Sequence, residues 1–169
     1  MGFGQPAAIG ACLAAGGCRT VAVDGDGGFQ MNVQELETIR RLGLSIKLFV
    51  VDNAGYGSIR ASQRGYFGRL TGADATSGLT LPDVVRVAEA YGLPGRRVSA
   101  PEGLRETVRA VLASPGPEVC VVEVPPDEPR APRVTSVQRP DGSMETTPLE
   151  DLWPFLPRDE LKANLIEPE

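Results

Sequence analysis

Three short apolar runs constrain the fold of this chain more than any other feature of its sequence. They cover residues 20–24, 46–51 and 118–124 and are rich in β-branched residues, and a weaker run lies at residues 96–99. Amphipathic helix patterns separate them. Near-continuous apolar strands that alternate with helices are typical of parallel sheets. We therefore predict an α/β fold, a doubly wound parallel sheet with helices on both faces.

The predicted helices have recognisable starts and stops. They cover residues 6–15, 32–42, 82–91 and 101–112. Asn32 is predicted to cap the second helix, with Glu35 three residues further on, and Gly43 to end it. Residues 54–80 are rich in Gly, Ser and Arg and predict a long loop with at most one short helix. Loops of this length in compact domains are usually functional or disordered.

The composition changes toward the C-terminus. Residues 125–133 carry four prolines and predict an extended connector. Beyond it, residues 140–142 form a predicted turn between two short strands, and residues 147–150 have the pattern of a helix capping box. We therefore divide the chain into a domain of residues 1–125 and a connector with a C-terminal extension, residues 126–169. The extension is too small to fold alone and is expected to pack on the domain or on a partner.

Composition excludes several classes of function. The chain has no histidine, so it cannot by itself carry Ser-His-Asp or Cys-His catalysis or a His-ligated metal. Its 17 basic and 22 acidic residues give a net charge of −5, which argues against a nucleic-acid partner. Its three cysteines are too few for a disulfide framework. The chain shows no membrane-spanning run and no signal peptide, so no membrane partner and a cytoplasmic location are expected.

Two polar, glycine-rich turns follow the first two predicted strands. They are Gly25-Asp26-Gly27-Gly28 and Asp52-Asn53-Ala54-Gly55-Tyr56-Gly57. Ligands bind at the carboxyl ends of parallel strands, and glycines let the backbone approach an anion closely. Mg²⁺ takes about six oxygens, of which the Asp26 carboxylate, the Asn53 amide and a carbonyl of the Ala54–Gly55 turn could supply three. Alternatively, both segments are ordinary turn chemistry without a ligand.

The same residues carry a resemblance to a known family. Asp26 and Asn53 lie 27 residues apart in a Gly-Asp-Gly…Asn frame that resembles the thiamine diphosphate motif of the acetolactate synthase and pyruvate decarboxylase superfamily. Residues 1–11 (MGFGQPAAIGA) are similar to the start of the core of its cofactor-binding domain. Residues 27–39 (GGFQMNVQELETI) match acetolactate synthase-like enzymes nearly throughout. The likeness covers residues 1–125 and implies the thiamine diphosphate-binding fold.

The resemblance implies thiamine diphosphate and Mg²⁺ as cofactors. It assigns the cofactor-binding positions Met1, Gly25, Asp26, Gly27, Gly28, Asn53, Gly55 and Tyr56. Of these, Asp26, Asn53 and the Gly55 backbone oxygen would hold the metal. Met1 falls where relatives use an apolar side chain to support the cofactor in its bent shape. Asp52 stands where the family usually has a second asparagine, which adds a negative charge beside the site.

The resemblance also implies a missing part. Family members carry a separate pyrimidine-binding domain whose glutamate activates the cofactor, and no glutamate of this chain can be assigned that role. We therefore expect a subunit or fragment of an acetolactate synthase-like 2-oxo acid decarboxylase or carboligase, a C–C lyase or transferase that is inactive alone. Its expected partners are a pyrimidine-binding-domain subunit, in a homo- or hetero-oligomer, and a 2-oxo acid substrate. The alternative is a truncated, non-catalytic paralogue that folds or oligomerises without turnover. The chain begins inside a functional segment, so a split enzyme, a gene fragment and a late start site all remain open.

The long loop offers thinner evidence on substrates. Residues 53–63 correspond to a loop that carries a tryptophan in branched-chain acetolactate synthases, and Ser62 stands at that place. The absence of that bulk argues against a housekeeping acetolactate synthase. Arg60, Arg64 and Arg69 either steer an anionic substrate or are solvated and paired, as loop arginines usually are.

Overall fold

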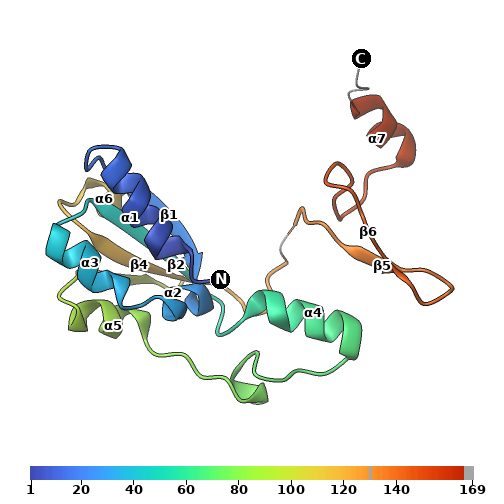
Figure 1. The fold of residues 1–169 in the computed structure, drawn as a ribbon, viewed down its shortest axis with the longest axis horizontal. Helices are drawn as coiled ribbons and strands as arrows, with labels where there is room; N and C mark the ends of the chain where they lie inside the picture. The colour runs from blue at the N-terminus through green and yellow to red at the C-terminus, as the bar shows by residue number, and fades with distance from the viewer. Residues whose placement is uncertain (130, 166–169) are drawn as a thin grey trace. The chain divides into compact units, whose positions relative to one another are not determined.

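A four-stranded parallel sheet forms the centre of the first part of the chain (Figure 1). Its strands are β1 (Thr20–Gly25), β2 (Ile46–Asp52), β3 (Gly95–Val98) and β4 (Glu118–Glu123). The strand order is β1-β2-β4-β3, and every neighbouring pair is parallel. This computed structural model describes residues 1–129 and 131–165. The predicted α/β fold with a parallel sheet is confirmed.

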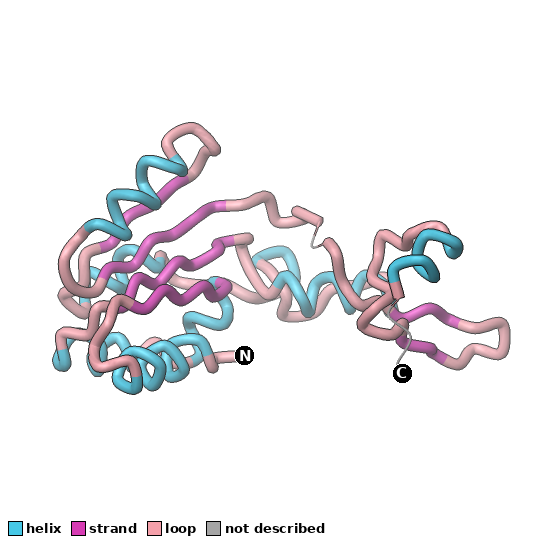
Figure 2. Tube along the Cα trace, turned by 90° about the horizontal axis from the view of Figure 1, so that it is seen from above, coloured by secondary structure: helices cyan, strands magenta, loops and turns pink. Residues whose placement is uncertain are grey.

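Helices lie on both sides of the sheet (Figure 2). They are α1 (Gly4–Ala14), α2 (Asp26–Met31), α3 (Glu35–Leu42), α5 (Val84–Ala90) and α6 (Leu104–Ala113). The helix α4 (Gly57–Phe67) and a 3-10 turn η1 (Ala75–Ser77) belong to the segment between β2 and α5. One face of the sheet packs against α1, α2, α3 and α5, and the other face packs against α6. The helices pack on the two faces of the sheet, and the chain leaves each strand at its carboxyl end toward a helix or a loop.

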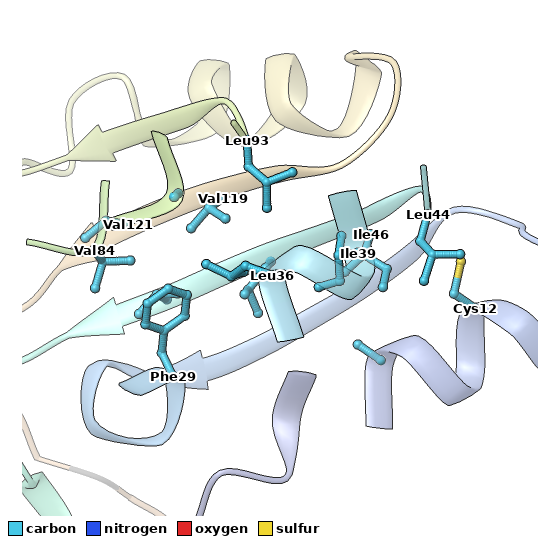
Figure 3. Packing of buried hydrophobic residues seen from close by; sticks show 14 residues of the cluster. Cys12, Phe29, Leu36, Ile39, Leu44, Ile46, Val84, Leu93, Val119 and Val121 are labelled. Carbon is cyan, nitrogen blue, oxygen red and sulfur yellow. The ribbon is translucent and has the colours of Figure 1, made fainter. Parts of the chain in front are cut away.

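The larger core cluster lies between the sheet and its four-helix side (Figure 3). Phe29 of α2 is fully buried there, together with Leu36 and Ile39, which lie three residues apart on one side of α3. The smaller cluster joins Phe49 and Cys120 of the sheet to Val111 of α6. The helices that pack on the sheet therefore bury apolar residues on one side, as the periodicity of the sequence predicts.

Strand β1 is less covered than predicted. Its apolar run predicts a strand buried on both faces, but Val21 is 52% and Val23 is 68% exposed. Both valines alternate with the partly buried Ala22, so they point to the face that α6 covers only over the other strands. The edge position of β1 in the sheet explains this difference.

The first glycine-rich turn is shorter than predicted, because α2 begins directly at Asp26. The predicted cap of the next helix is wrong. The Asn32 side chain donates to the Gly2 carbonyl (2.6 Å), and α3 has Gln34 as its N-cap without a side-chain cap bond. The Asn32 side-chain oxygen, which a cap would use as acceptor, accepts from the Gln34 side-chain amide instead (2.9 Å). Gly43, at φ 60°, ends α3 as predicted.

The segment predicted as a long loop contains an eleven-residue helix, α4, which ends at Gly68 with φ 62°. After it the chain returns to the second glycine-rich turn. Gly55 forms an isolated antiparallel bridge with Asp74, and the Tyr56 amide donates to the Ala73 carbonyl (2.8 Å). The loop is therefore anchored to the turn that precedes α4.

Residues Met1–Asp127 form one compact unit and Glu128–Glu169 another. The second unit contains an antiparallel hairpin of β5 (Ser136–Gln138) and β6 (Met144–Thr146), followed by α7 (Arg158–Asn164). The predicted turn is present, with Gly142 at φ 85°. The predicted capping box is not, because the Thr147 hydroxyl bonds to the Thr135 carbonyl. Across both described ranges, no helix has the length and apolar character needed to cross a membrane.

Candidate cofactor site

The two glycine-rich turns meet at the carboxyl ends of β1 and β2. Asp26, the first residue of α2, is 4% exposed. One of its carboxylate oxygens accepts a hydrogen bond from the Gly27 amide (2.7 Å). The other accepts from the Gly55 amide (2.8 Å), which belongs to the turn after β2. This second bond joins the two turns and brings Asp26 to the segment that contains Asn53.

Glycines fix the shape of the turn after β2. Gly55 has φ 139°, and a Cβ there would overlap the Ala73 carbonyl oxygen. A Cβ on Gly57 would overlap the Asn53 side-chain amide, so Asn53 lies directly against this glycine. The Gly55 carbonyl accepts one bond from the Gly57 amide (3.0 Å). A carbonyl oxygen has two lone pairs, so the Gly55 oxygen keeps capacity for a second partner.

Glycines also bring the start of α2 against its neighbours. A Cβ on Gly27 would overlap the ring of Tyr56, and a Cβ on Gly28 would overlap the Asp24 carboxylate. The Gly25 amide donates to that same carboxylate (2.8 Å). The two turns therefore pack together through positions where a larger residue would force them apart.

Met1 lies beside this region but its side chain is largely free. Met1 is 78% exposed, and the chain start lies near α2 (Figure 1). The link is made by its neighbour Gly2, whose carbonyl accepts from Asn32 at the end of α2. The structure thus brings all eight positions implied by the resemblance into one region, with Met1 at its margin.

Burial raises the pKa of Asp26 above the usual value for an aspartate. The amides of Gly55 and Gly27 oppose this shift, and the negative charge of Asp52 adds to it. Asp52 itself accepts from the Ala54 amide (3.0 Å) and lies 3.9 Å from the Arg97 guanidinium. Within the described residues Asp26 has no ion pair, so a bound cation would stabilise its charged form.

The donor set fits a hard cation that shares its ligands with phosphate. No cluster of three or more His, Cys, Asp or Glu side chains suited to a metal occurs in the described ranges. One carboxylate with amide and carbonyl oxygens remains, which is the oxygen environment that Mg²⁺ takes up beside phosphate. A cavity of about 390 Å³ opens beside Asp26 and is bordered by Asp52, Gly55, Asp83 and Arg97, among others.

Within residues 1–129 and 131–165, three buried acceptors without partners lie on the neighbouring elements α1, β1 and α2. They are Gln5 Oε1 of α1, Asp24 Oδ2 of β1 and Gln30 Oε1 of α2, which have no hydrogen-bond partner within the described part of the chain. Unsatisfied buried polar atoms are uncommon in folded proteins, and each one calls for water, an ion or another ligand group. These atoms support a polar ligand environment at this end of the sheet.

The structure adds two residues that the sequence did not single out as partners of the site. Arg60 of α4 is 2% exposed, and its guanidinium donates to the carbonyls of Asn53 (2.9 Å) and Pro126 (2.6 Å). Asp74, 3.7 Å from Arg60, caps η1 and bridges to Gly55. The Asp-x-x-Ser pattern at 74–77 could have predicted the cap. Nothing in the sequence predicts a buried arginine, because arginine is almost never buried unless paired.

Arg60 is buried, and one of its terminal nitrogens donates to two backbone carbonyls, which argues against a role in steering a substrate. Arg64 is exposed and forms an ion pair with Asp127. Arg69 is exposed. Their exposure agrees with both alternatives, steering of an anionic substrate and a solvated or paired surface arginine, so the choice between them stays open.

Fold and site together define an α/β cofactor-binding domain, with a buried carboxylate and an amide at the carboxyl edge of a parallel sheet. Residues 1–124 match the family model "Thiamine pyrophosphate enzyme, C-terminal TPP binding domain". The chain belongs to this family. Thiamine pyrophosphate, another name for thiamine diphosphate, is the family's cofactor, and Mg²⁺ is its standard companion ion.

The most similar relatives include acetolactate synthases. The chain is 37% identical to the acetolactate synthase large subunit of Cyanidium caldarium over 72% of this chain and 21% of the relative. It is 31% identical to the acetolactate synthase isozyme 2 large subunit of Escherichia coli (strain K12), over 99% of this chain and 26% of the relative. The chain thus spans about a fifth to a quarter of the length of these relatives.

A solved structure shows the same fold. The thiamine diphosphate-dependent 4-hydroxybenzoylformate decarboxylase of Rhodococcus jostii RHA1 superposes with a TM-score of 0.66 at 27% identity. The match covers 76% of this chain and 24% of that protein. The resemblance seen in the sequence is therefore confirmed at the level of the family and the fold.

Proposed function

We propose that this chain is the thiamine diphosphate- and Mg²⁺-binding part of an acetolactate synthase-like 2-oxo acid decarboxylase or carboligase. The observation that carries the proposal is the hydrogen bond from the Gly55 amide to the buried Asp26 carboxylate. It links the two turns from which the metal ligands would come: the Asp26 carboxylate, the Asn53 amide oxygen and the Gly55 backbone oxygen.

The remaining positions would hold the cofactor. Gly25 is the N-cap of α2, and Gly27 and Gly28 lie in its first turn; the backbone of these glycines would border the diphosphate. Tyr56 packs on Gly27 and would border the diphosphate. Met1, exposed beside α2, would support the cofactor in its bent shape. When bound, the cofactor supplies the electron sink for decarboxylation of a 2-oxo acid.

The contribution of this chain is binding and orientation. Its buried carboxylate fixes the metal, its turns fix the diphosphate, and the activating glutamate would come from a pyrimidine-binding domain outside the chain. We therefore infer an assembly, homo- or hetero-oligomeric and cytoplasmic, with the active site shared between the two domains. The chain alone should bind its cofactor without turnover.

Calorimetry tests this proposal directly. Thiamine diphosphate is titrated into the full chain with and without Mg²⁺, and into Asp26→Asn and the matched control Asp127→Asn. Asp127 is an exposed aspartate of the same unit. We expect Mg²⁺-dependent binding by the wild type and the control, and a loss of at least 100-fold in Asp26→Asn. Equal Mg²⁺-dependent binding by Asp26→Asn would contradict the ligand assignment.

A second measurement separates the enzyme from the non-catalytic alternative. Pyruvate consumption is followed with the chain alone and after mixing with a chain that carries a pyrimidine-binding domain. Turnover only after mixing supports the proposed assembly. Binding without turnover in both cases favours the truncated paralogue, and turnover by the chain alone would contradict the external glutamate.

A further inference from the structure

Arg60 is the most deeply buried arginine described near the candidate site. It lies in the first turn of α4, and only 2% of its surface is exposed. A guanidinium loses its hydration on burial, which is costly unless its donors are paired. The position of Arg60 therefore has to be explained by the groups that its donors reach.

Those groups are mainly backbone carbonyls from two distant segments. One terminal nitrogen donates to the Asn53 carbonyl (2.9 Å) and to the Pro126 carbonyl (2.6 Å). The other lies 3.7 Å from the Asp74 carboxylate. The planar, rigid guanidinium fixes the relative positions of its acceptors better than a flexible ammonium can. Arg60 thus links the backbone carbonyl of Asn53 to the Pro126 carbonyl and to the Asp74 carboxylate.

The Asn53–Tyr56 turn is held at both of its ends by Arg60 and by the loop that contains Asp74. Arg60 binds the turn at its first residue, through the Asn53 carbonyl. Asp74, which faces Arg60, bridges to Gly55, and the preceding residue Ala73 accepts from the Tyr56 amide. The turn is therefore held from one side by Arg60 and from the other by the loop that Arg60 contacts.

We propose that Arg60 is a positioning residue for the metal site, acting through the Asn53 peptide and the Asp74 loop. This inference rests on the proposed function of Asn53 and Gly55 as metal ligands. The proposed role involves no contact with substrate, because the Arg60 side chain is buried and one of its terminal nitrogens donates to two backbone carbonyls. Its role is to hold the amide oxygen of Asn53 and the carbonyl of Gly55 at the spacing that one cation requires.

The test measures Mn²⁺ binding to the full chain in the presence of thiamine diphosphate, by the electron paramagnetic resonance signal of free Mn²⁺. The variants are Arg60→Met, Arg60→Lys and Arg64→Met, a matched control on the exposed side of α4. We expect Arg60→Met to weaken Mn²⁺ binding at least 10-fold and Arg60→Lys to restore part of the loss. Arg64→Met should stay within twofold of the wild type.

A stability control separates positioning from a general loss of folding. Val111→Ala removes buried volume in the other core cluster, on α6, and lowers the melting temperature without touching the site. At a temperature where all variants are folded, Val111→Ala should bind Mn²⁺ like the wild type. An equal loss of affinity in Val111→Ala and Arg60→Met, or no loss in Arg60→Met, would overturn the inference.

Amide hydrogen exchange keeps the inference testable if the wild type binds no Mn²⁺, an outcome that would refute the proposed function alone. The Gly55 and Tyr56 amides donate to Asp26 and Ala73. In Arg60→Met these two amides should exchange at least 10-fold faster, while those of β4 stay unchanged. Unchanged exchange at Gly55 and Tyr56 would show that Arg60 does not hold the turn.

Discussion

The two edges of the sheet bury charge in different ways. At the carboxyl edge, Asp26 is buried with two amide donors and no ion pair among the described residues. At the amino edge, Lys47 is the second residue of β2 and Glu118 the first of β4, and they are 1% and 2% exposed. Here the charges are connected: Lys47 donates to the Ser114 hydroxyl (2.7 Å), and that hydroxyl also bonds to Glu118.

The amino edge leaves little unused bonding capacity. The Lys47 ammonium also donates to the carbonyls of Ser114 (2.8 Å) and Gly116 (2.6 Å), which accounts for its three donors. Arg96 pairs with the Glu118 carboxylate. Buried charges that are paired in this way serve the structure. Asp26 instead has two backbone amides and the neighbouring Asp52 carboxyl around it, so it can accept a cation. The difference supports the proposal that the carboxyl edge binds the ligand.

Among the substitutions that test this difference between the two edges, Lys47→Met should have the largest effect on the free energy of unfolding. The substitution removes three hydrogen bonds from a buried ammonium, to the Ser114 hydroxyl and to the Ser114 and Gly116 carbonyls. Because each bond has a charged donor, we expect a loss of about 3–5 kcal/mol in the free energy of unfolding. Urea denaturation measures the loss. Mn²⁺ affinity, measured at a temperature where the variant is folded, should not change. A loss below about 1 kcal/mol would show that the amino edge is not the structural network that its contacts indicate.

The sequence predicts the sheet and the meeting of the two turns well. Apolar runs locate β1, β2 and β4 within one residue or so, because buried strands need continuous apolar residues. Because the carboxyl ends of parallel strands lie at the same edge of the sheet, the sequence predicts that Asp26 lies near the turn after β2. The hydrogen bond from the Gly55 amide to Asp26 shows this contact. The role of these residues as metal ligands stays a prediction.

The sequence fails where tertiary contacts outweigh local signals. The side chains of Asn32 and Thr147 stand at capping positions but bond to distant backbone carbonyls, of Gly2 and Thr135. Lys47 and Arg60 belong to residue types that are expected at the surface, and their burial depends on carbonyls that only the folded chain brings near. No local pattern contains that information.

Two glycine substitutions sharpen the comparison at the carboxyl edge. Gly27→Ala places a methyl group where the Tyr56 ring lies, so the two turns must separate. We expect a loss of about 1–3 kcal/mol in unfolding free energy, together with weaker Mg²⁺-dependent cofactor binding. Gly65→Ala, in the exposed part of α4 with open space around it, is the control and should stabilise by about 0.5–1 kcal/mol. Equal effects of the two substitutions would show that the Gly27–Tyr56 contact is dispensable.

The smallest effect concerns Asp83, which caps α5 near the carboxyl edge. The hydrogen bond from the Arg86 amide (3.1 Å) and the nearby Arg97 guanidinium hold the pKa of Asp83 below its usual value. Because the folded state lowers this pKa, the charged carboxylate stabilises the fold above about pH 4. That contribution is lost as the pH falls through the lowered value.

Asp83→Asn tests this contribution, since asparagine also caps helices but carries no charge. We expect the wild type to be more stable than the variant at pH 7 by about 0.5 kcal/mol or less, because solvent screens a partly exposed pair. The difference should shrink as the pH falls through the lowered pKa of Asp83, because the wild-type carboxyl becomes protonated there. Melting temperatures of both proteins from pH 7 to pH 3 measure it. If the advantage of the wild type over Asp83→Asn grew as the pH fell, the charged Asp83 carboxylate would be repelled by acidic neighbours. The carboxyl edge would then carry uncompensated negative charge beyond Asp26.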